Sequence, residues 1–309
     1  MSEKVLITQP IDPEGMALLD SAGLVVDVWP GPEPIPHHEL HERIKGCSGL
    51  ISMLTDPVNA ELMALGPLRV VAQHAVGTNN IDLIAAADRG VRVGHTPGVL
   101  TNATADLTMA LLLSSARRIV ESDRYVRDGH WKGWSPTLMR GMELNGSVLG
   151  IVGMGRIGQA VSHRAKAFGM TVIHHSRRGG CGLDVLLEQS DVVSLHCPLT
   201  PQTHHLLNQA AFERMKSSAV LINTSRGPVV DEASLVGALE AGQIAGAGLD
   251  VFEEEPKVHP GLLNNAKVVL LPHIGSATVA TRRKMGEMVA VDLIRGLKGE
   301  PMLHEVKNA

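Results

Sequence analysis

Hydrophobic residues in this chain gather in short runs rich in Val, Ile and Leu, and stretches with helical periodicity separate these runs. Most of the runs are continuously apolar, which is typical of parallel strands covered on both faces. Helical patterns lie between them, for example at residues 156–168, 208–216 and 231–241. This alternation predicts an α/β fold with doubly wound parallel sheets. We expect strands at residues 5–9, 49–54, 69–75, 147–153, 170–176, 191–197, 219–225, 245–251 and 267–273.

The length of the chain indicates more than one domain. At ~100–200 residues per domain, 309 residues predict about two domains. Residues 101–128 contain neither Gly nor Pro and form the longest helical candidate, so we expect one long helix that connects the domains. A last helix at about 277–298 leads into a short tail.

Composition narrows the class of protein. Hydrophobic residues make up 44% of the chain and aromatic residues only 2%, so we expect a globular protein with an aliphatic core. The net charge of −4 leaves no basic surplus for nucleic acid. Three widely spaced cysteines suit a reducing compartment. No signal pattern or spanning apolar run is present, so we expect a cytoplasmic protein without a membrane partner.

A glycine motif follows the strand expected at residues 147–153. The pattern GxGxxG is formed by Gly153, Gly155 and Gly158, with Arg156 and Ile157 between the last two. A helical stretch follows. In such a turn the first Gly allows the tight bend, the second lets the backbone approach a pyrophosphate, and the third lets helix pack on strand. The motif predicts a dinucleotide site, although a small-residue turn in an α/β sheet gives the same pattern.

The end of the next strand suggests which dinucleotide is bound. Ser176 lies 18 residues after Gly158, where an NAD-selective site carries an acidic residue, and Arg177 and Arg178 follow it. A hydroxyl and two guanidiniums favour a 2′-phosphate. We therefore expect NADP(H) to be preferred, with NAD(H) possible. A solvated basic loop is the alternative interpretation.

Three further candidates stand at the ends of expected strands: Arg226, Glu255 and His273. Ligands of open parallel sheets bind beyond the carboxyl ends of strands, so the three could converge. Arg226 could hold a carboxylate, and His273 could donate a proton to a carbonyl oxygen. Glu255 would favour the charged imidazole and orient its ring. This set fits reduction of a 2-oxo acid, but spacing alone leaves surface ion pairs open.

Several histidine pairs invite a metal interpretation that we do not adopt. No Cys or second carboxylate pattern completes a site around His37, His38 and His41, so we expect a polar loop there. His204 and His205 flank the expected cofactor cleft and need no metal role. The sequence-based expectation is that the protein has no metal site.

Taken together, the motifs of this chain resemble those of the D-isomer-specific 2-hydroxyacid dehydrogenases over nearly its whole length. The matching segments occur in family order at residues 54–58, 74–82, 96–108, 150–160, 196–203, 222–232, 246–256 and 271–278. The resemblance implies that Arg226, Glu255 and His273 are the catalytic trio, with Glu255 chosen because it immediately precedes the proline. It also implies a Rossmann-type cofactor domain (98–280) inserted in a smaller flavodoxin-like substrate domain (1–97 plus 281–309).

The same resemblance assigns binding residues. It implies that the substrate contacts Leu54, Ala75, Val76 and Gly77, together with Arg226 and His273. It implies further cofactor contacts at Thr104, Cys197, Pro198, Thr203, Thr224, Ser225, Asp250 and Ser276. The chain looks most similar to glyoxylate and hydroxypyruvate reductases, which are dimers, so we expect a homodimer through the region around 100–145. The stretch at 179–190 is shorter than in relatives, so we expect a peripheral strand or helix to be missing beside the adenine site.

These observations favour an NADP(H)-preferring reductase that converts glyoxylate or hydroxypyruvate to glycolate or D-glycerate. Two alternatives remain open at this point. One is an NAD-dependent dehydrogenase of the D-lactate or phosphoglycerate type, because residues 1–97 set the pocket size. The other is a non-catalytic dinucleotide sensor that binds partner proteins.

Overall fold

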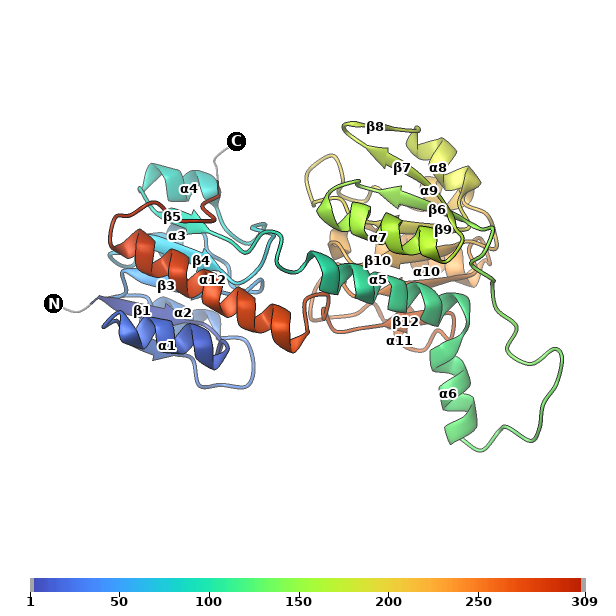
Figure 1. Ribbon diagram of the computed structural model, residues 1–309, viewed down its shortest axis with the longest axis horizontal. Helices are drawn as coiled ribbons and strands as arrows, with labels where there is room; N and C mark the ends of the chain where they lie inside the picture. The colour runs from blue at the N-terminus through green and yellow to red at the C-terminus, as the bar shows by residue number, and fades with distance from the viewer. Residues whose placement is uncertain (1–2, 307–309) are drawn as a thin grey trace. The chain divides into compact units, whose positions relative to one another are not determined.

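The computed structural model describes residues 3–306 and divides the chain into two compact units (Figure 1). One unit joins residues 1–100 to residues 276–309, and the other spans residues 101–275. These boundaries fall three and five residues from the expected ones. The terminal residues 1–2 and 307–309 of the expected substrate domain lie outside the described part of the chain. Within that part, no helix is long and apolar enough to cross a membrane.

The first unit is built on a five-stranded parallel sheet with the order β2-β1-β3-β4-β5. Its strands are β1 (Lys4–Ile7), β2 (Val25–Val28), β3 (Gly49–Ser52), β4 (Val70–Gln73) and β5 (Arg92–Gly94). This is the flavodoxin-like strand order. Two of the strands, β2 and β5, were not predicted, because β2 is only half-buried and β5 has three residues.

Helices cover both faces of this sheet. They are α1 (Pro13–Ser21), α2 (His37–Arg43), α3 (Ala60–Ala64), α4 (Leu83–Asp88) and α12 (Val279–Leu297). On one face, α12 buries Val289 and Leu293 against Val5 and Val70 of the sheet. On the other, α2 and α3 contribute to a separate apolar layer over Leu50. The C-terminal helix is therefore part of this unit's core, which explains why the chain returns to it.

The second unit contains a seven-stranded sheet with the order β12-β11-β10-β9-β6-β7-β8. Its strands are β6 (Val148–Val152), β7 (Thr171–Ser176), β8 (Gly179–Gly180), β9 (Val192–Leu195), β10 (Val220–Asn223), β11 (Gly246–Leu249) and β12 (Val268–Leu270). All neighbours are parallel except β7 and β8. The expected doubly wound α/β architecture is confirmed.

Two apolar layers sandwich this second sheet. The helices of one face are α5 (Thr101–Ala116) and α7 (Arg156–Ala167), which pack on Leu149 and Ile151. The helices of the other face are α8 (Leu183–Gln189), α9 (Gln209–Arg214) and α10 (Glu232–Glu240), whose core includes Phe212 and Leu235. A short helix, α11 (Pro260–Leu263), and a 3-10 turn, η1 (Gly227–Val229), complete the unit.

The prediction of a single helix over residues 101–128 is wrong, because this stretch forms two helices. The helix α5 ends at Ala116, and a second helix, α6 (Ile119–Arg127), begins after Arg118, which has a left-handed backbone (φ 54°). Figure 1 shows α6 and the irregular segment that follows it extending away from the rest of their unit. None of the α6 residues is buried. The break therefore redirects the chain away from the sheet.

The short connection at residues 179–190 holds two small elements. Gly179 and Gly180 form β8, which pairs antiparallel with His175 and Ser176 at the edge of the sheet. The helix α8 follows at once and buries Leu186 and Leu187. A two-residue hairpin strand thus occupies the sheet edge beside β7.

Candidate active site

The carboxyl ends of five adjacent parallel strands, β6 and β9 to β12, lie on the same side of the second sheet. Val152 pairs with Leu195, Leu195 with Asn223, Asn223 with Leu249, and Leu249 with Leu270. The loops after these residues therefore emerge side by side. Because β6 leads to β7 on one side while β9 lies on the other, the switch point of the sheet falls at β6. A bound dinucleotide is expected at this place.

The glycine turn after β6 has the geometry that a pyrophosphate needs. Gly153 has φ 99°, and a Cβ there would lie 2.6 Å from the backbone nitrogen of Cys197. A Cβ at Gly158 would lie 2.2 Å from the carbonyl oxygen of Gly153, so helix and turn touch. A Cβ at Gly155 would have nothing within 4 Å, and Gly155 caps α7 without a side-chain bond. The open helix start at Gly155 therefore fits a phosphate group.

The basic residues after β7 occupy the loop of the β7–β8 hairpin. Arg177 and Arg178 are exposed there. The Ser176 hydroxyl donates to the carbonyl of Gly179 (2.9 Å) and accepts from the backbone of Arg178 (3.4 Å). Ser176 therefore stabilises the hairpin itself, and the two guanidiniums are the groups left to contact a ligand.

The loop after β9 carries Cys197, Pro198 and Thr203. Burial raises the pKa of the Cys197 thiol to about 11, so the sulfur stays protonated and is no nucleophile at neutral pH. Thr203 Oγ1 donates to the carbonyl of Pro198 (2.7 Å) and accepts from the backbone of Thr200 (2.8 Å). These bonds fix the loop that faces the glycine turn.

Asp250 follows β11 and presents an unused acceptor. Its Oδ1 accepts from the backbone of Ile274 (2.7 Å), whereas its buried Oδ2 has no hydrogen-bond partner among the described residues. Burial raises the pKa of this carboxyl. Thr104 Oγ1 donates to the carbonyl of Gly275 (3.2 Å), and a Cβ at Gly275 would lie 3.2 Å from Asp250 Oδ2. A buried acceptor of this kind suits an amide donor from a ligand.

The remaining expected cofactor contacts are more dispersed. Thr224 is buried, and its hydroxyl lies 2.9 Å from that of Thr108. Arg156 is exposed, and Ile157 is half-buried on α7. Ser276 begins the return of the chain to the first unit.

Arg226 is held by a compact loop after β10. Asn223 organises this loop, since its Oδ1 accepts from Ser225 and its Nδ2 donates to the Arg226 carbonyl (3.0 Å). A Cβ at Gly227 would lie 1.8 Å from the carbonyl oxygen of Phe252. This contact brings the Arg226 loop against the loop that carries Glu255. Burial lowers the pKa of the Arg226 guanidinium, and the charge of Glu255 opposes that shift.

His273 and Glu255 form a pair at the same edge. His273 Nδ1 lies 2.7 Å from Glu255 Oε2, and both side chains are about three-quarters buried, at 28% and 27% exposure. Glu255 Oε1 accepts from the backbone of Phe252 (3.1 Å), which fixes the carboxylate. Because Nδ1 faces the carboxylate, Nε2 is the ring nitrogen that can exchange a proton with a ligand. The structure thus brings together two of the three expected catalytic residues directly.

The other expected substrate residues, Leu54, Ala75, Val76 and Gly77, lie in the first unit, on loops that are tied to each other. The backbone of Thr96 donates to the Ala75 carbonyl (2.9 Å), and His95 Nδ1 lies 2.9 Å from the Val76 carbonyl oxygen. Gln73 Nε2 donates to Asn80 Oδ1 (2.8 Å) and, at 3.4 Å, to the Gly77 carbonyl.

Asn80 joins this loop to the loop of Leu54. Its Nδ2 donates to the carbonyls of Met53 (3.0 Å) and Asp56 (2.8 Å), and Leu54 between them is half-buried. The two loops are therefore fixed before any ligand binds.

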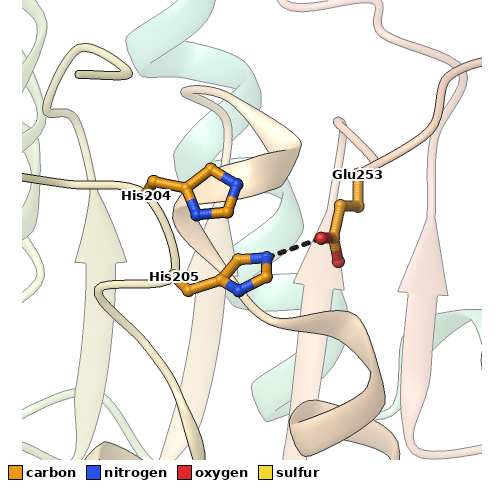
Figure 2. Close-up of side chains that lie close together, drawn as sticks. All are labelled: His204, His205 and Glu253. Carbon is orange, nitrogen blue, oxygen red and sulfur yellow. Dashed lines mark hydrogen bonds and ion pairs between the residues drawn. The ribbon is translucent and has the colours of Figure 1, made fainter. Parts of the chain in front are cut away.

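The sequence did not reveal a second histidine–glutamate pair. His205 Nε2 lies 2.5 Å from Glu253 Oε1, and the ring of His204 stacks on that of His205 (Figure 2). His205 and Glu253 are 48 positions apart in the sequence, so no local spacing signals the contact. Asn223 was also missed, although an Asn at a strand end is a recognisable turn former.

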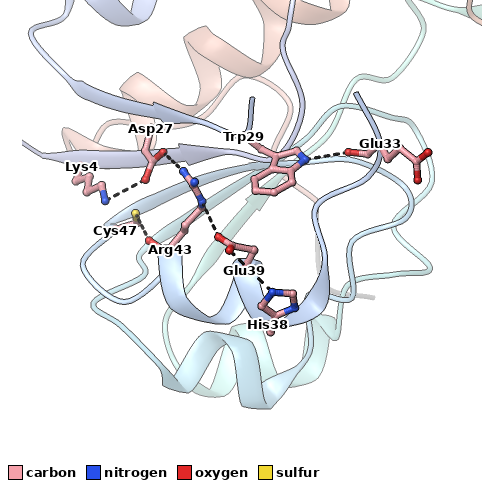
Figure 3. A network of polar contacts seen from close by, with 8 residues as sticks. All are labelled: Lys4, Asp27, Trp29, Glu33, His38, Glu39, Arg43 and Cys47. Atoms are coloured by element: carbon pink, nitrogen blue, oxygen red, sulfur yellow. Dashed lines mark hydrogen bonds and ion pairs between the residues drawn. The ribbon is translucent and has the colours of Figure 1, made fainter. Parts of the chain in front are cut away.

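The prediction of a polar loop around His37, His38 and His41 is wrong. These residues lie in the helix α2, where Arg43 bonds Glu39 (3.2 Å) and also Asp27 of β2 (2.7 Å), as Figure 3 shows. Pro36 precedes the helix and supplies the extended backbone from which it starts. The helix is thus anchored to the sheet by an ion-pair network.

The fold and this sheet edge define a dinucleotide-binding protein with a histidine–glutamate pair placed for proton transfer. Comparison with known proteins carries this further. The sequence model of the D-isomer specific 2-hydroxyacid dehydrogenase, NAD binding domain, matches residues 109–275. A glyoxylate reductase from Korarchaeum cryptofilum is 48% identical, with 97% of this chain and 94% of the relative covered. The chain belongs to the D-isomer-specific 2-hydroxyacid dehydrogenase family.

Solved structures agree with that assignment. A Thermus thermophilus protein is 47% identical, has a TM-score of 0.94, and covers 98% of this chain and 100% of its own. An NADPH-dependent glyoxylate/hydroxypyruvate reductase from Sinorhizobium meliloti, in complex with NADP and malonate, is 32% identical with a TM-score of 0.87 over the whole of both chains. The protein is therefore an NAD(P)-dependent oxidoreductase of CH–OH donors that acts on small 2-oxo or 2-hydroxy acids.

Proposed function

We propose that the protein is an NADPH-preferring reductase of glyoxylate and hydroxypyruvate, with glycolate and D-glycerate as products. The observation that carries this proposal is the His273–Glu255 pair, which lies beyond the carboxyl ends of the strands, on the same side of the sheet as the glycine turn. Relatives named glyoxylate reductase, at 43–48% identity, support the choice of substrate.

Each member of the expected trio has a separate role in this reaction. Arg226 binds the substrate carboxylate, helped by the backbone of Ala75, Val76 and Gly77 and by Leu54. His273 donates a proton from Nε2 to the 2-oxo oxygen, and Glu255 holds the ring through Nδ1. A reduced nicotinamide, when bound, would supply the hydride for the carbonyl carbon.

The dinucleotide is held by the turn at Gly153, Gly155 and Gly158 and by the buried loops around it. The unpartnered Oδ2 of Asp250 is an acceptor suited to the carboxamide of the nicotinamide ring. The remaining contacts are assigned, in this proposal, to Thr104, Arg156, Ile157, Cys197, Pro198, Thr203, Thr224, Ser225 and Ser276.

NADPH is preferred in this proposal because two exposed arginines follow β7 and no Asp or Glu comes before Asp184. Arg177 and Arg178 sit at the hairpin loop, free to pair with a 2′-phosphate. Arg177→Ala is expected to raise the KM for NADPH about tenfold or more while the KM for NADH stays nearly constant. Arg214→Ala, on α9, removes an exposed arginine elsewhere on the unit and serves as the control. An unchanged ratio of the two KM values in Arg177→Ala would remove the basis for the preference.

The assay that tests the reaction follows NADPH and NADH oxidation with four acids in parallel: glyoxylate, hydroxypyruvate, pyruvate and phosphohydroxypyruvate. We expect the highest kcat/KM with NADPH and one of the first two. Highest turnover with NADH and pyruvate or the phosphorylated acid would instead indicate a dehydrogenase of the D-lactate or phosphoglycerate type. Cofactor binding without turnover on any acid would indicate a dinucleotide sensor.

We also propose that the protein is a homodimer through α6 and the segment after it. Trp131 and Trp134 are 55% and 85% exposed, and Ile119, Val120 and Val126 are also exposed on α6. Exposed apolar side chains of this kind are ones that a second copy would cover. Trp134→Glu is expected to shift the mass measured by light scattering from two chains to one. A single-chain mass for the unmodified protein would contradict the proposal.

The cysteines support a cytoplasmic location, which we include in the proposal. Cys47, Cys181 and Cys197 are all unpaired. Unpaired thiols are typical of proteins in a reducing compartment.

A further inference from the structure

Three side chains of metal-ligand type, none of them part of the His273–Glu255 pair, meet in the second unit. One ligand atom from each of His204, His205 and Glu253 lies within 4.8 Å of the other two (Figure 2). The imidazole rings are stacked with centroids 4.0 Å apart, and His205 Nε2 lies 2.5 Å from Glu253 Oε1. We propose that this cluster is a binding site for a divalent transition-metal ion, zinc above all.

The donor set favours zinc over the hard cations. Two imidazole nitrogens and one carboxylate oxygen are a combination that binds zinc in a tetrahedral site, with water as the fourth ligand. Magnesium and calcium prefer oxygen ligands alone. Zinc bonds of about 2.0–2.1 Å place tetrahedral ligand atoms about 3.3 Å apart. His205 and Glu253 would separate slightly to admit the ion, and the exposed ring of His204 would rotate inward.

Two of the three ligands are already held in place. The backbone nitrogen of His205 donates to the carbonyl of Pro228 (2.8 Å), and His205 has a left-handed backbone (φ 48°). Glu253 Oε2 accepts from the backbone of Glu232 (3.1 Å), and the Glu253 backbone donates to Glu232 Oε1 (2.6 Å). Outer bonds of this kind orient metal ligands in proteins. The side chains of His205 and Glu253 are 34% and 27% exposed, so an ion can reach them.

The surrounding charges also favour a cation. The carboxylate of Asp231 interacts electrostatically with His205, and that of Glu232 interacts with Glu253. Three carboxylates thus lie around two imidazoles. A bound zinc ion would take the place of the direct contact between His205 Nε2 and Glu253 Oε1.

The site adjoins the turn that carries Glu255 without using its side chain. Glu255 Oε1 accepts from the backbone of Phe252, next to Glu253 in the chain. An ion held by Glu253 would tether this turn to the loop of His204 and His205. Since the cluster forms only in the folded chain, zinc is expected to stabilise the second unit by mass action.

The proposal is tested on the full chain after removal of adventitious metal with a chelator. Zinc chloride is titrated calorimetrically, and thermal unfolding is followed with and without zinc. We expect one zinc per chain, a rise in Tm with zinc, and no comparable effect of magnesium chloride. His204→Ala and Glu253→Gln should each weaken zinc binding at least about tenfold. His204 is exposed, so its replacement should leave the fold intact.

The chain offers a matched control in the other unit. The ring centroids of His37 and His41 also lie 4.0 Å apart, with the rings tilted by 45°, but these two residues belong to no group of three ligands within the described residues. The double variant His37→Ala/His41→Ala should bind zinc as the unmodified protein does. Absence of saturable zinc binding would overturn the proposal. So would unchanged binding in both His204→Ala and Glu253→Gln, or loss of binding in the control.

Discussion

Acidification should destabilise the first unit through one buried histidine, His74. This residue follows β4 and is 7% exposed, and neither ring nitrogen has a hydrogen-bond partner among the described residues. Burial, together with the nearby charge of Arg282, lowers the pKa of His74 to about 4. In the unfolded chain the pKa is that of an ordinary histidine, about 6.5.

The sign and size of the effect follow from these two values. Above about pH 6.5, His74 is neutral in both the folded and the unfolded chain, and no stability is lost. Below it the unfolded chain binds a proton that the folded chain refuses, so stability falls until about pH 4. Each pH unit in this window costs about 1.4 kcal/mol, so at about pH 5 the loss is about 2 kcal/mol.

The variant His74→Leu isolates this contribution. Urea unfolding followed by circular dichroism would give the free energy of unfolding of both proteins at about pH 7.5 and about pH 5. When the pH falls from about 7.5 to about 5, we expect the free energy of unfolding of the variant to rise by about 2 kcal/mol relative to that of the original protein. Val71→Ala, which opens a cavity in β4 just before His74 without removing a titrating group, should cost the same at both pH values. A pH-independent difference for His74→Leu would refute the reasoning.

The glycine turn and the His273–Glu255 pair give two further predictions. Gly158→Ala should lower the stability by about 1–3 kcal/mol because its Cβ would clash with Gly153, whereas Gly155→Ala should keep the Tm and weaken NADPH binding at least tenfold. Thermal unfolding and NADPH fluorescence titration separate these effects, and parallel losses in both variants would count against the assignment. Glu255→Gln should lower kcat about a hundredfold with unchanged NADPH affinity, because its charge no longer supports His273. Assays of NADPH oxidation and NADPH binding titrations check this prediction. An unchanged kcat would show that the charge of Glu255 is dispensable.

Features encoded in adjacent residues were the most predictable. The nine expected strands and the glycine turn depend on short runs and fixed spacing, and all nine correspond to strands in the structure. The position of His273 and Glu255 at one edge followed from the rule that parallel strands end together. Their 2.7 Å contact depends on how the loops after β11 and β12 fold toward each other, which spacing does not reveal.

Features that depend on tertiary contacts were missed. The two-residue strand β8 exists only because it pairs with β7. The break at Arg118 carries no Gly or Pro, and its left-handed backbone follows from where the chain must turn. The helix α2 owes its position to the bonds of Arg43 with Glu39 and Asp27. Likewise, the pairing of His205 with Glu253 joins loops after different strands.

The central claim, that His273 donates the proton in an NADPH-dependent reduction, is tested most directly with His273→Gln. Glyoxylate-dependent NADPH oxidation and NADPH affinity would be measured on the same preparation. We predict a fall in kcat of about 10²–10⁴-fold, while the Kd for NADPH changes less than about twofold. A kcat close to that of the unmodified protein, or equal losses in turnover and NADPH affinity, would contradict the account.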